Sequence, residues 1–248
     1  MTKLPIKLGK EPLIDVVFEL RFASQMPASA LLPGLLVTRL QSTDEVSIDR
    51  LPAADLPAQF RDSDPMLRYV PLIVLRWKGF LINIGDRSLS ITCPPPYKGW
   101  DAFKQAIVEV VSVLKEAPYI LKLERQGLKY VDFLPIVDLR RQVESVNIKL
   151  ALGGHELEQE TFLVRMEIPD RQFVKIVQVV SSAAVTLEGE QKIGLVVDVD
   201  VICPLEISVQ DYLNGLAVML DETHQLNKET FFACLTKHTV DTLEPYYE

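Results

Sequence analysis

The stretch Arg68–Cys93, RYVPLIVLRWKGFLINIGDRSLSITC, decides the predicted fold. It holds three apolar runs rich in β-branched residues, and short breaks at Lys78-Gly79 and Gly85–Arg87 separate them. Glycine allows the tight turns that join neighbouring antiparallel strands. The pattern predicts a three-stranded antiparallel β-meander, with strands over residues 68–77, 80–84 and 88–93.

A proline run follows the meander in ITCPPPYKGW, residues 91–100. Proline donates no hydrogen bond to a strand ladder, so Pro94–Pro96 should end the third strand. Trp100, Phe103 and Ile107 then recur at helical spacing, which predicts a helix over residues 100–115 with one apolar face. We expect Cys93, at the end of the strand, to be buried and unreactive.

The rest of the N-terminal half adds two strands and a short helix. PLIDVVFELRF, residues 12–22, alternates its side chains and predicts a strand, and residues 121–134 predict a long second one. A helix over residues 33–40 begins at Pro33. The polar, proline-containing segment over residues 41–64 predicts a loop.

The C-terminal half repeats the order of strands followed by a helix. Cys203-Pro204 echoes Cys93-Pro94 at the end of its last predicted strand. A helix over residues 209–222 follows, and Asn227 is placed to cap a second helix that runs to about residue 243. The predicted strands of this half cover residues 147–152, 161–168, 173–181, 185–187 and 193–203.

These patterns predict an α+β protein of two similar antiparallel β-meander-plus-helix halves packed together, with an extra C-terminal helix. The halves are residues 1–136 and 137–248, joined in one compact unit. The chain has 248 residues, of which 48% are hydrophobic, so it is long enough and apolar enough to bury a substantial core.

The net charge, the N-terminal sequence and the cysteine spacing limit the classes of protein to which the chain is expected to belong. The net charge of −8 provides no electrostatic signal for nucleic-acid binding. The N-terminal residues MTKLPIKLGKEP lack the apolar core of a signal peptide, and no apolar run is long enough for a membrane span, so we expect a cytoplasmic protein. Cys93, Cys203 and Cys234 lack the spacing of a disulfide framework or zinc site. The apolar content also favours a homo-oligomer.

Several phrases together carry a resemblance that spans almost the whole chain. Through them the protein resembles a sporadically distributed family of bacterial and archaeal proteins, and the resemblance implies no particular reaction or cofactor. Such patchy distribution is typical of mobile or defence-associated genes. The chain departs from the family pattern at Lys129, where arginine is expected, and at Asp132, where asparagine is expected. The phrases are PLIDVVFELRF (12–22), YKGWDAFKQAI (97–107), GLKYVDFL (127–134), LVVDVDV (195–201) and LNKETFFACLTKHTVDTLEP (226–245).

Asp198 and Asp200 are candidate metal ligands. At positions i and i+2 of a strand they face the same side, about 6–7 Å apart at Cα. Two carboxylates so placed can hold Mg²⁺ or Mn²⁺. Glu167 joins them as a third ligand if its strand lies next to theirs. The alternative is a solvated strand face, opposite the apolar face of the same strand.

Four further charged residues are candidates for binding a ligand or partner: Glu19, Arg21, Lys129 and Arg165. They stand at alternating positions of apolar strands. If their strands face one concavity, they would surround a polar ligand. Cross-strand ion pairs on an outer sheet face account for the same residues.

Two functions follow from these candidates. The leading hypothesis is a non-enzymatic binding or interaction protein with no cofactor, whose sheet surface takes a protein partner or a small ligand. The alternative is a metal-dependent phosphoryl-transfer or phosphohydrolase enzyme acting on a nucleotide or polyphosphate. No nucleotide-binding loop, zinc-protease motif or nucleophile elbow supports a named enzyme class.

Overall fold

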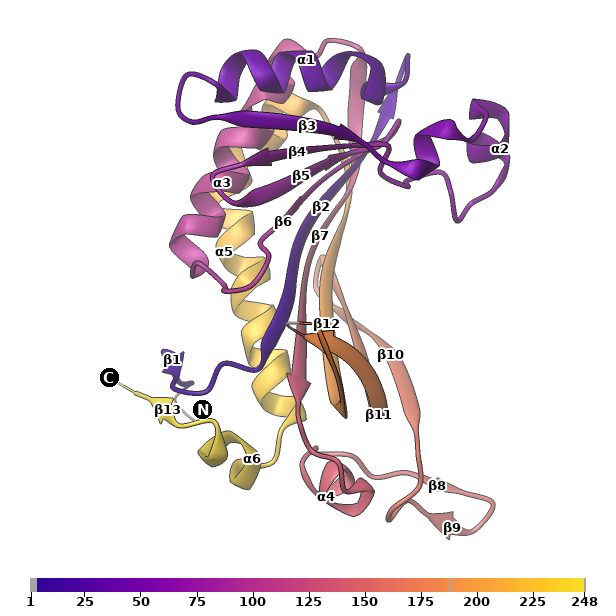
Figure 1. Ribbon diagram of the computed structural model, residues 1–248, viewed down its shortest axis with the longest axis vertical. Coiled ribbons are helices and arrows are strands. Elements are labelled where there is room, and N and C mark those ends of the chain that lie inside the picture. Colours follow the sequence, from indigo (N-terminus) through magenta and orange to yellow (C-terminus); the bar gives the residue numbers. More distant parts are fainter. Residues whose placement is uncertain (1–3, 188, 248) are drawn as a thin grey trace. The chain divides into compact units, whose positions relative to one another are not determined.

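The computed structural model describes residues 4–187 and 189–247, and its main feature is a nine-stranded antiparallel sheet (Figure 1). The strand order is β10-β11-β12-β7-β2-β6-β5-β4-β3. The α+β class is therefore confirmed. The strands are β2 (Leu13–Ser24), β3 (Val46–Arg50), β4 (Ile73–Trp77), β5 (Phe80–Ile84), β6 (Ser88–Thr92), β7 (Ile120–Leu134), β10 (Leu163–Asp170), β11 (Phe173–Leu187) and β12 (Glu190–Ile207).

The chain forms two compact units, and each takes segments from both ends of the sequence. The first unit comprises residues 4–14, 129–201 and 224–247 among those described. The second comprises residues 15–128 and 202–223. Strands β2, β7 and β12 contribute residues to both units, so the division does not follow the order of the chain.

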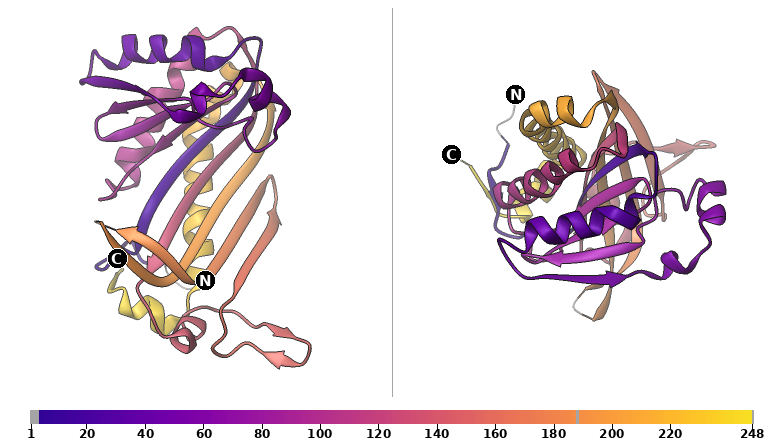
Figure 2. Two further views of the ribbon diagram at one scale, coloured as in Figure 1. Left: turned by 45° about the vertical axis from the view of Figure 1, so that its right-hand side comes forward. Right: turned by 90° about the horizontal axis from the view of Figure 1, so that it is seen from above.

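The predicted meander is confirmed as β4, β5 and β6 in the second unit, but its first strand begins at Ile73 and not at residue 68. Lys78 and Gly79 form its first turn, both with positive φ, a conformation that favours glycine. Helix α1 (Ala28–Leu40) packs against β4 and β5. Helix α3 (Trp100–Ser112) lies beside the same strands (Figure 2). Its Phe103 ring stacks on Phe80 of β5, with centroids 6.0 Å apart.

Strand β2 follows the alternation that the sequence predicts. One face is fully buried, and its Phe18 and Leu20 pair across the ladder with Ile91 and Leu89 of β6. The other face carries half-buried Val17, Glu19 and Arg21, which lie away from the core. Because successive strand residues point to opposite faces, the apolar face is buried in the core and the charged face stays accessible.

The segment over residues 41–64 is not the loop that the sequence predicts. It contains edge strand β3, the 3₁₀ helix η1 (Pro52–Asp55) and the short helix α2 (Ala58–Ser63). β3 pairs with β4 in register from Val46–Trp77 to Arg50–Ile73. Val46 and Ile48 alternate with polar residues, but this run is short and mostly exposed, so it is a weak signal for a strand.

Two predictions about the C-terminal half are wrong. Helix α5 (Val209–Cys234) is continuous, so Asn227 does not cap a second helix. The Asn227 side chain is buried and donates to the backbone oxygen of Val199, 2.8 Å away. Strand β12 also continues through Cys203-Pro204 to Ile207, whereas β6 ends before Cys93. The two Cys-Pro sites therefore differ in local structure.

The remaining elements are short. Asp138 caps α4 through the Arg141 backbone N–H, and Thr236 caps α6 through the Thr239 backbone N–H. No helix among the described residues is long and apolar enough to span a membrane. These elements are β1 (Lys7–Leu8), η2 (Val113–Glu116), α4 (Leu139–Glu144), β8 (Ala151–Leu152), β9 (His155–Glu156), α6 (Lys237–Thr242) and β13 (Pro245–Tyr246).

Candidate functional site

A cavity of about 390 Å³ lies over β2 and β6 in the second unit, and we call it the sheet-face hollow. Its floor is the half-buried face of β2 together with the matching residues of β6. Its wall is the segment between α2 and β4. The lining residues are Val17, Glu19, Arg21, Pro65, Met66, Tyr69, Val70, Pro71, Ser88 and Ser90.

Glu19 and Arg21 form the polar centre of the sheet-face hollow. They are adjacent on one face of β2, and the guanidinium makes two hydrogen bonds to the carboxylate, one of them through Nη2 to Oε2 at 3.2 Å. The guanidinium carbon also lies 4.2 Å from the centroid of the Tyr69 ring. A carboxylate on one side and an aromatic face on the other hold the guanidinium in one orientation.

Two serines of β6 complete the floor. Ser90 lies opposite Glu19 in the ladder and Ser88 lies opposite Arg21. The Ser88 hydroxyl donates to the Tyr69 backbone oxygen at 2.9 Å, which ties the wall to the sheet. The Ser90 hydroxyl accepts a long hydrogen bond of 3.5 Å from the Asn83 amide. Ser90 therefore retains its own O–H as a donor to a ligand.

The wall of the sheet-face hollow is mainly apolar. Pro65, Val70 and Pro71 line it, and Met66 has 87% of its surface exposed. Methionine is flexible and polarizable, so it adapts to ligands of different shape. The site thus combines a polar floor with an apolar, adaptable wall, as small-molecule sites commonly do.

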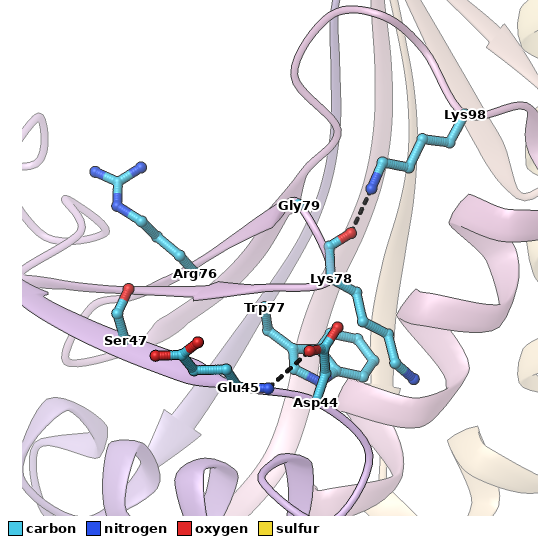
Figure 3. A pocket seen from close by; sticks show the side chains of 8 residues that line it. All are labelled: Asp44, Glu45, Ser47, Arg76, Trp77, Lys78, Gly79 and Lys98. Carbon is cyan, nitrogen blue, oxygen red and sulfur yellow. Dashed lines mark hydrogen bonds between the residues drawn. The ribbon is translucent and has the colours of Figure 1, made fainter.

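A second cavity of about 610 Å³ lies at the β3–β4 margin of the second unit and is more open to solvent; we call it the edge hollow. Figure 3 shows the Lys98 ammonium pointing toward the Lys78 backbone oxygen and the Arg76 guanidinium pointing away from the other residues drawn. Lys78 lies 3.3 Å from Glu109, and Lys98 donates to the Lys78 backbone oxygen. The lining residues are Asp44, Glu45, Ser47, Arg76, Trp77, Lys78, Gly79 and Lys98.

The structure places Asp198 in an ion pair. Its Oδ2 lies 2.7 Å from the Lys129 ammonium, which neutralises the carboxylate that the sequence proposes as a metal ligand. Asp200 lies two residues further along β12. Within the described ranges, no three His, Cys, Asp or Glu side chains gather in a way that could hold a metal ion.

The strand of Glu167 does not lie next to the strand of Asp198 and Asp200, so Glu167 cannot join them as a third metal ligand. It lies on β10, and β11 separates β10 from β12. Its carboxylate instead accepts from Arg165 of the same strand at 2.6 Å. Six of the seven candidate residues, all except Asp200, are therefore found as three separate pairs: Glu19 with Arg21, Lys129 with Asp198, and Arg165 with Glu167.

Asp132 is a buried carboxyl of the first unit that the sequence did not single out as a site. Only 5% of the residue is exposed. Burial raises its pKa well above the ordinary value, and the nearby carboxylates of Glu11 and Asp198 raise it further. Such a group favours its protonated form in the folded protein.

Sequence reasoning found the charged centre of the sheet-face hollow and missed Tyr69, Ser88 and Ser90. The serines alternate with apolar residues along β6, and this period of two was available as a signal. Tyr69 precedes β4, and nothing local indicates that its ring reaches Arg21. No protein-family model matches the chain, and a comparison with curated proteins finds no significant match.

Proposed function

We propose that the protein is a non-enzymatic, cytoplasmic binding protein whose ligand occupies the sheet-face hollow. The observation that carries this proposal is the guanidinium of Arg21, held between the Glu19 carboxylate and the Tyr69 ring in a cavity of about 390 Å³. Cavities from about 300 Å³ upward take small ligands. A donor group fixed before binding loses little conformational entropy when the ligand arrives.

The charges of the sheet-face hollow indicate the class of ligand. The two charged side chains among its described lining residues, Glu19 and Arg21, compensate each other. An anion would meet the Glu19 carboxylate and a cation would meet the Arg21 guanidinium. A compact zwitterion or amide avoids both conflicts, because it presents donors and acceptors together. Ser90 adds a hydroxyl, and Pro65 and Met66 add apolar contact.

A thermal-shift screen with matched variants tests the proposal. The probes are free amino acids and dipeptides as zwitterions, with inorganic phosphate and Mg²⁺–ATP as anionic comparators. We expect some of the zwitterions to raise the melting temperature of the wild type. Arg21→Met should abolish that rise.

Arg76→Met is the matched control, because Arg76 also forms an ion pair, with Asp49 at 3.3 Å, but lines the edge hollow. This variant should retain the ligand-dependent rise. The proposal fails if no zwitterion stabilises the wild type. It also fails if the rise survives Arg21→Met or if it is lost in Arg76→Met.

We also propose that the two meander-plus-helix segments derive from one duplicated unit. In each, three consecutive strands precede a helix: β4–β6 before α3, and β10–β12 before α5. The different course of β6 and β12 at Cys-Pro would then reflect divergence after duplication.

A further inference from the structure

The outer edge of β10 is the terminal edge of the sheet (Figure 1). The orientation of its backbone follows from the pairing with β11, where the Phe162 oxygen accepts from the Ser181 N–H at 3.0 Å. Even-numbered residues of β10 therefore direct their N–H and C=O groups toward β11, since backbone polarity alternates along a strand. Residues 163, 165, 167 and 169 direct theirs outward.

The exposed apolar side chains of this edge suggest that it pairs with another strand. Pro169, which has no N–H, is one of the outward residues, so β10 keeps its full ladder to β11 while a partner strand would lack one hydrogen bond at Pro169. Leu163 and Met166 are 63% and 55% exposed. Exposed apolar side chains on an unpaired edge strand favour pairing with another chain. The opposite edge, β3, has only five residues, and so short a strand offers few hydrogen bonds to an added strand.

The β10 sequence LVRMEIPD is complementary to itself in antiparallel orientation. With a two-fold axis at Met166, Arg165 lies opposite Glu167 of the second copy, and Val164 lies opposite Ile168. Arg165 and Glu167 are both outward residues, so each such pair exchanges two backbone hydrogen bonds. Moving the axis to Arg165 or to Glu167 places like charges directly opposite each other, which is unfavourable.

The apolar face of β10 supports the same register. Val164 and Met166 lie opposite Val179 and Val177 of β11, which are buried. Adding a second β10 about Met166 continues this stripe with the apolar residues of the other copy. In this register Met166 also packs against Met166 of the second copy, which removes its exposed apolar surface from water.

We propose that the protein forms a homodimer in which the β10 strands of two copies pair antiparallel about Met166, joining their sheets edge to edge. The occupant of the β10 edge is thus a second copy of this chain. Strand pairing over this length is a small interface, so dissociation is measurable at roughly micromolar concentrations. The dimer is independent of the ligand proposed for the sheet-face hollow.

Charge reversal at Arg165 and Glu167 tests the register, because both residues are exposed and do not contribute to the core. The measurement is sedimentation equilibrium of the full chain up to about 100 µM, a range that covers micromolar dimers. Arg165→Glu alone and Glu167→Arg alone each place like charges opposite each other twice. We expect each single variant to weaken dimerisation by about tenfold or more.

Two combinations should restore the dimer. The double variant R165E/E167R recovers opposite charges across the axis, and an equimolar mixture of the two single variants should form a heterodimer. Ile48→Glu on β3 is the control and should leave the dimer intact. Circular dichroism verifies that each variant is folded. A wild type that remains monomeric, a dimer that survives Arg165→Glu, or a dimer broken by Ile48→Glu would each overturn the proposal.

Discussion

The ammonium group of Lys129 lies 2.7 Å from the carboxylate of Asp198, across neighbouring strands β7 and β12 of the first unit. This contact places a cation where a metal ion would have to bind. Asp198 has only 16% of its side chain exposed, so it needs a compensating charge. Lys129 provides that charge from within the chain.

We therefore expect Mg²⁺ and Mn²⁺, alone or with ATP, to leave the melting temperature of the wild type unchanged. Lys129→Met should lower the free energy of unfolding by about 1 kcal/mol, because it leaves the Asp198 carboxylate without its partner. Thermal shift and urea unfolding measure the two effects. A metal-dependent rise in melting temperature that Asp198→Asn abolishes would instead support the phosphoryl-transfer alternative.

Asp132 should make stability depend on pH. Its folded pKa is raised by burial and by Glu11 and Asp198, so the folded state binds a proton that the unfolded state releases. Its contribution is therefore most favourable below the ordinary carboxyl pKa of about 4 and declines as pH rises toward the folded pKa. Asp132→Asn removes this titration. In urea unfolding, the variant should gain stability relative to wild type between pH 5 and pH 8. An equal difference at both pH values would contradict the assignment.

A buried polar network in the second unit should contribute strongly to stability. Tyr212 donates its hydroxyl hydrogen to the Gln126 oxygen, and the Gln126 amide donates to Thr223 at 3.0 Å. Gln126→Leu removes the acceptor for Tyr212 and should cost about 1–3 kcal/mol of unfolding free energy. Combining it with Tyr212→Phe, which removes the stranded hydroxyl, should restore part of the loss. A double variant whose loss equals or exceeds the sum of the two single losses would argue against direct coupling.

The cysteines should react slowly with thiol reagents in the folded protein. Cys93 and Cys203 are almost fully buried, and burial raises the pKa of the Cys203 and Cys234 thiols, which lowers the thiolate fraction. Cys234 is the most accessible, so it should be labelled first. Time-resolved labelling with single-cysteine variants, with urea-unfolded protein as the reference, measures the order. Rapid labelling of Cys93 would show that its environment is open.

The hydrophobic pattern of the sequence was sufficient to predict elements in which buried residues recur at regular spacing. The meander β4–β6 and the strands β2 and β7 alternate or run apolar in sequence, so their existence was predictable. β3 was missed because the alternation of Val46 and Ile48 with polar residues is short and lies within a polar segment that contains prolines. The break expected at Asn227 was wrong because its amide finds a partner in Val199, far away in the chain. A helix can therefore continue through a residue that on its own favours a cap.

The candidate site was likewise predictable in part from the sequence. The period of two along a strand places Glu19 and Arg21 on one side of β2, and this required only their spacing. That Tyr69 covers Arg21, and that Ser88 and Ser90 lie beside them, depends on β6 pairing with β2. Strand order is set by contacts between distant segments, which no local pattern encodes.

The α+β class, the meander and the faces on which charged residues stand follow from hydrophobic periodicity, which decides which side of an element is buried. Tertiary structure alone decided which charges meet. It paired Asp198 with Lys129, separated Glu167 from both by β11, and left β10 at the edge of the sheet. The physical reason is that an ion pair or cavity depends on distances between strands, and those distances follow from the order in which the sheet is assembled.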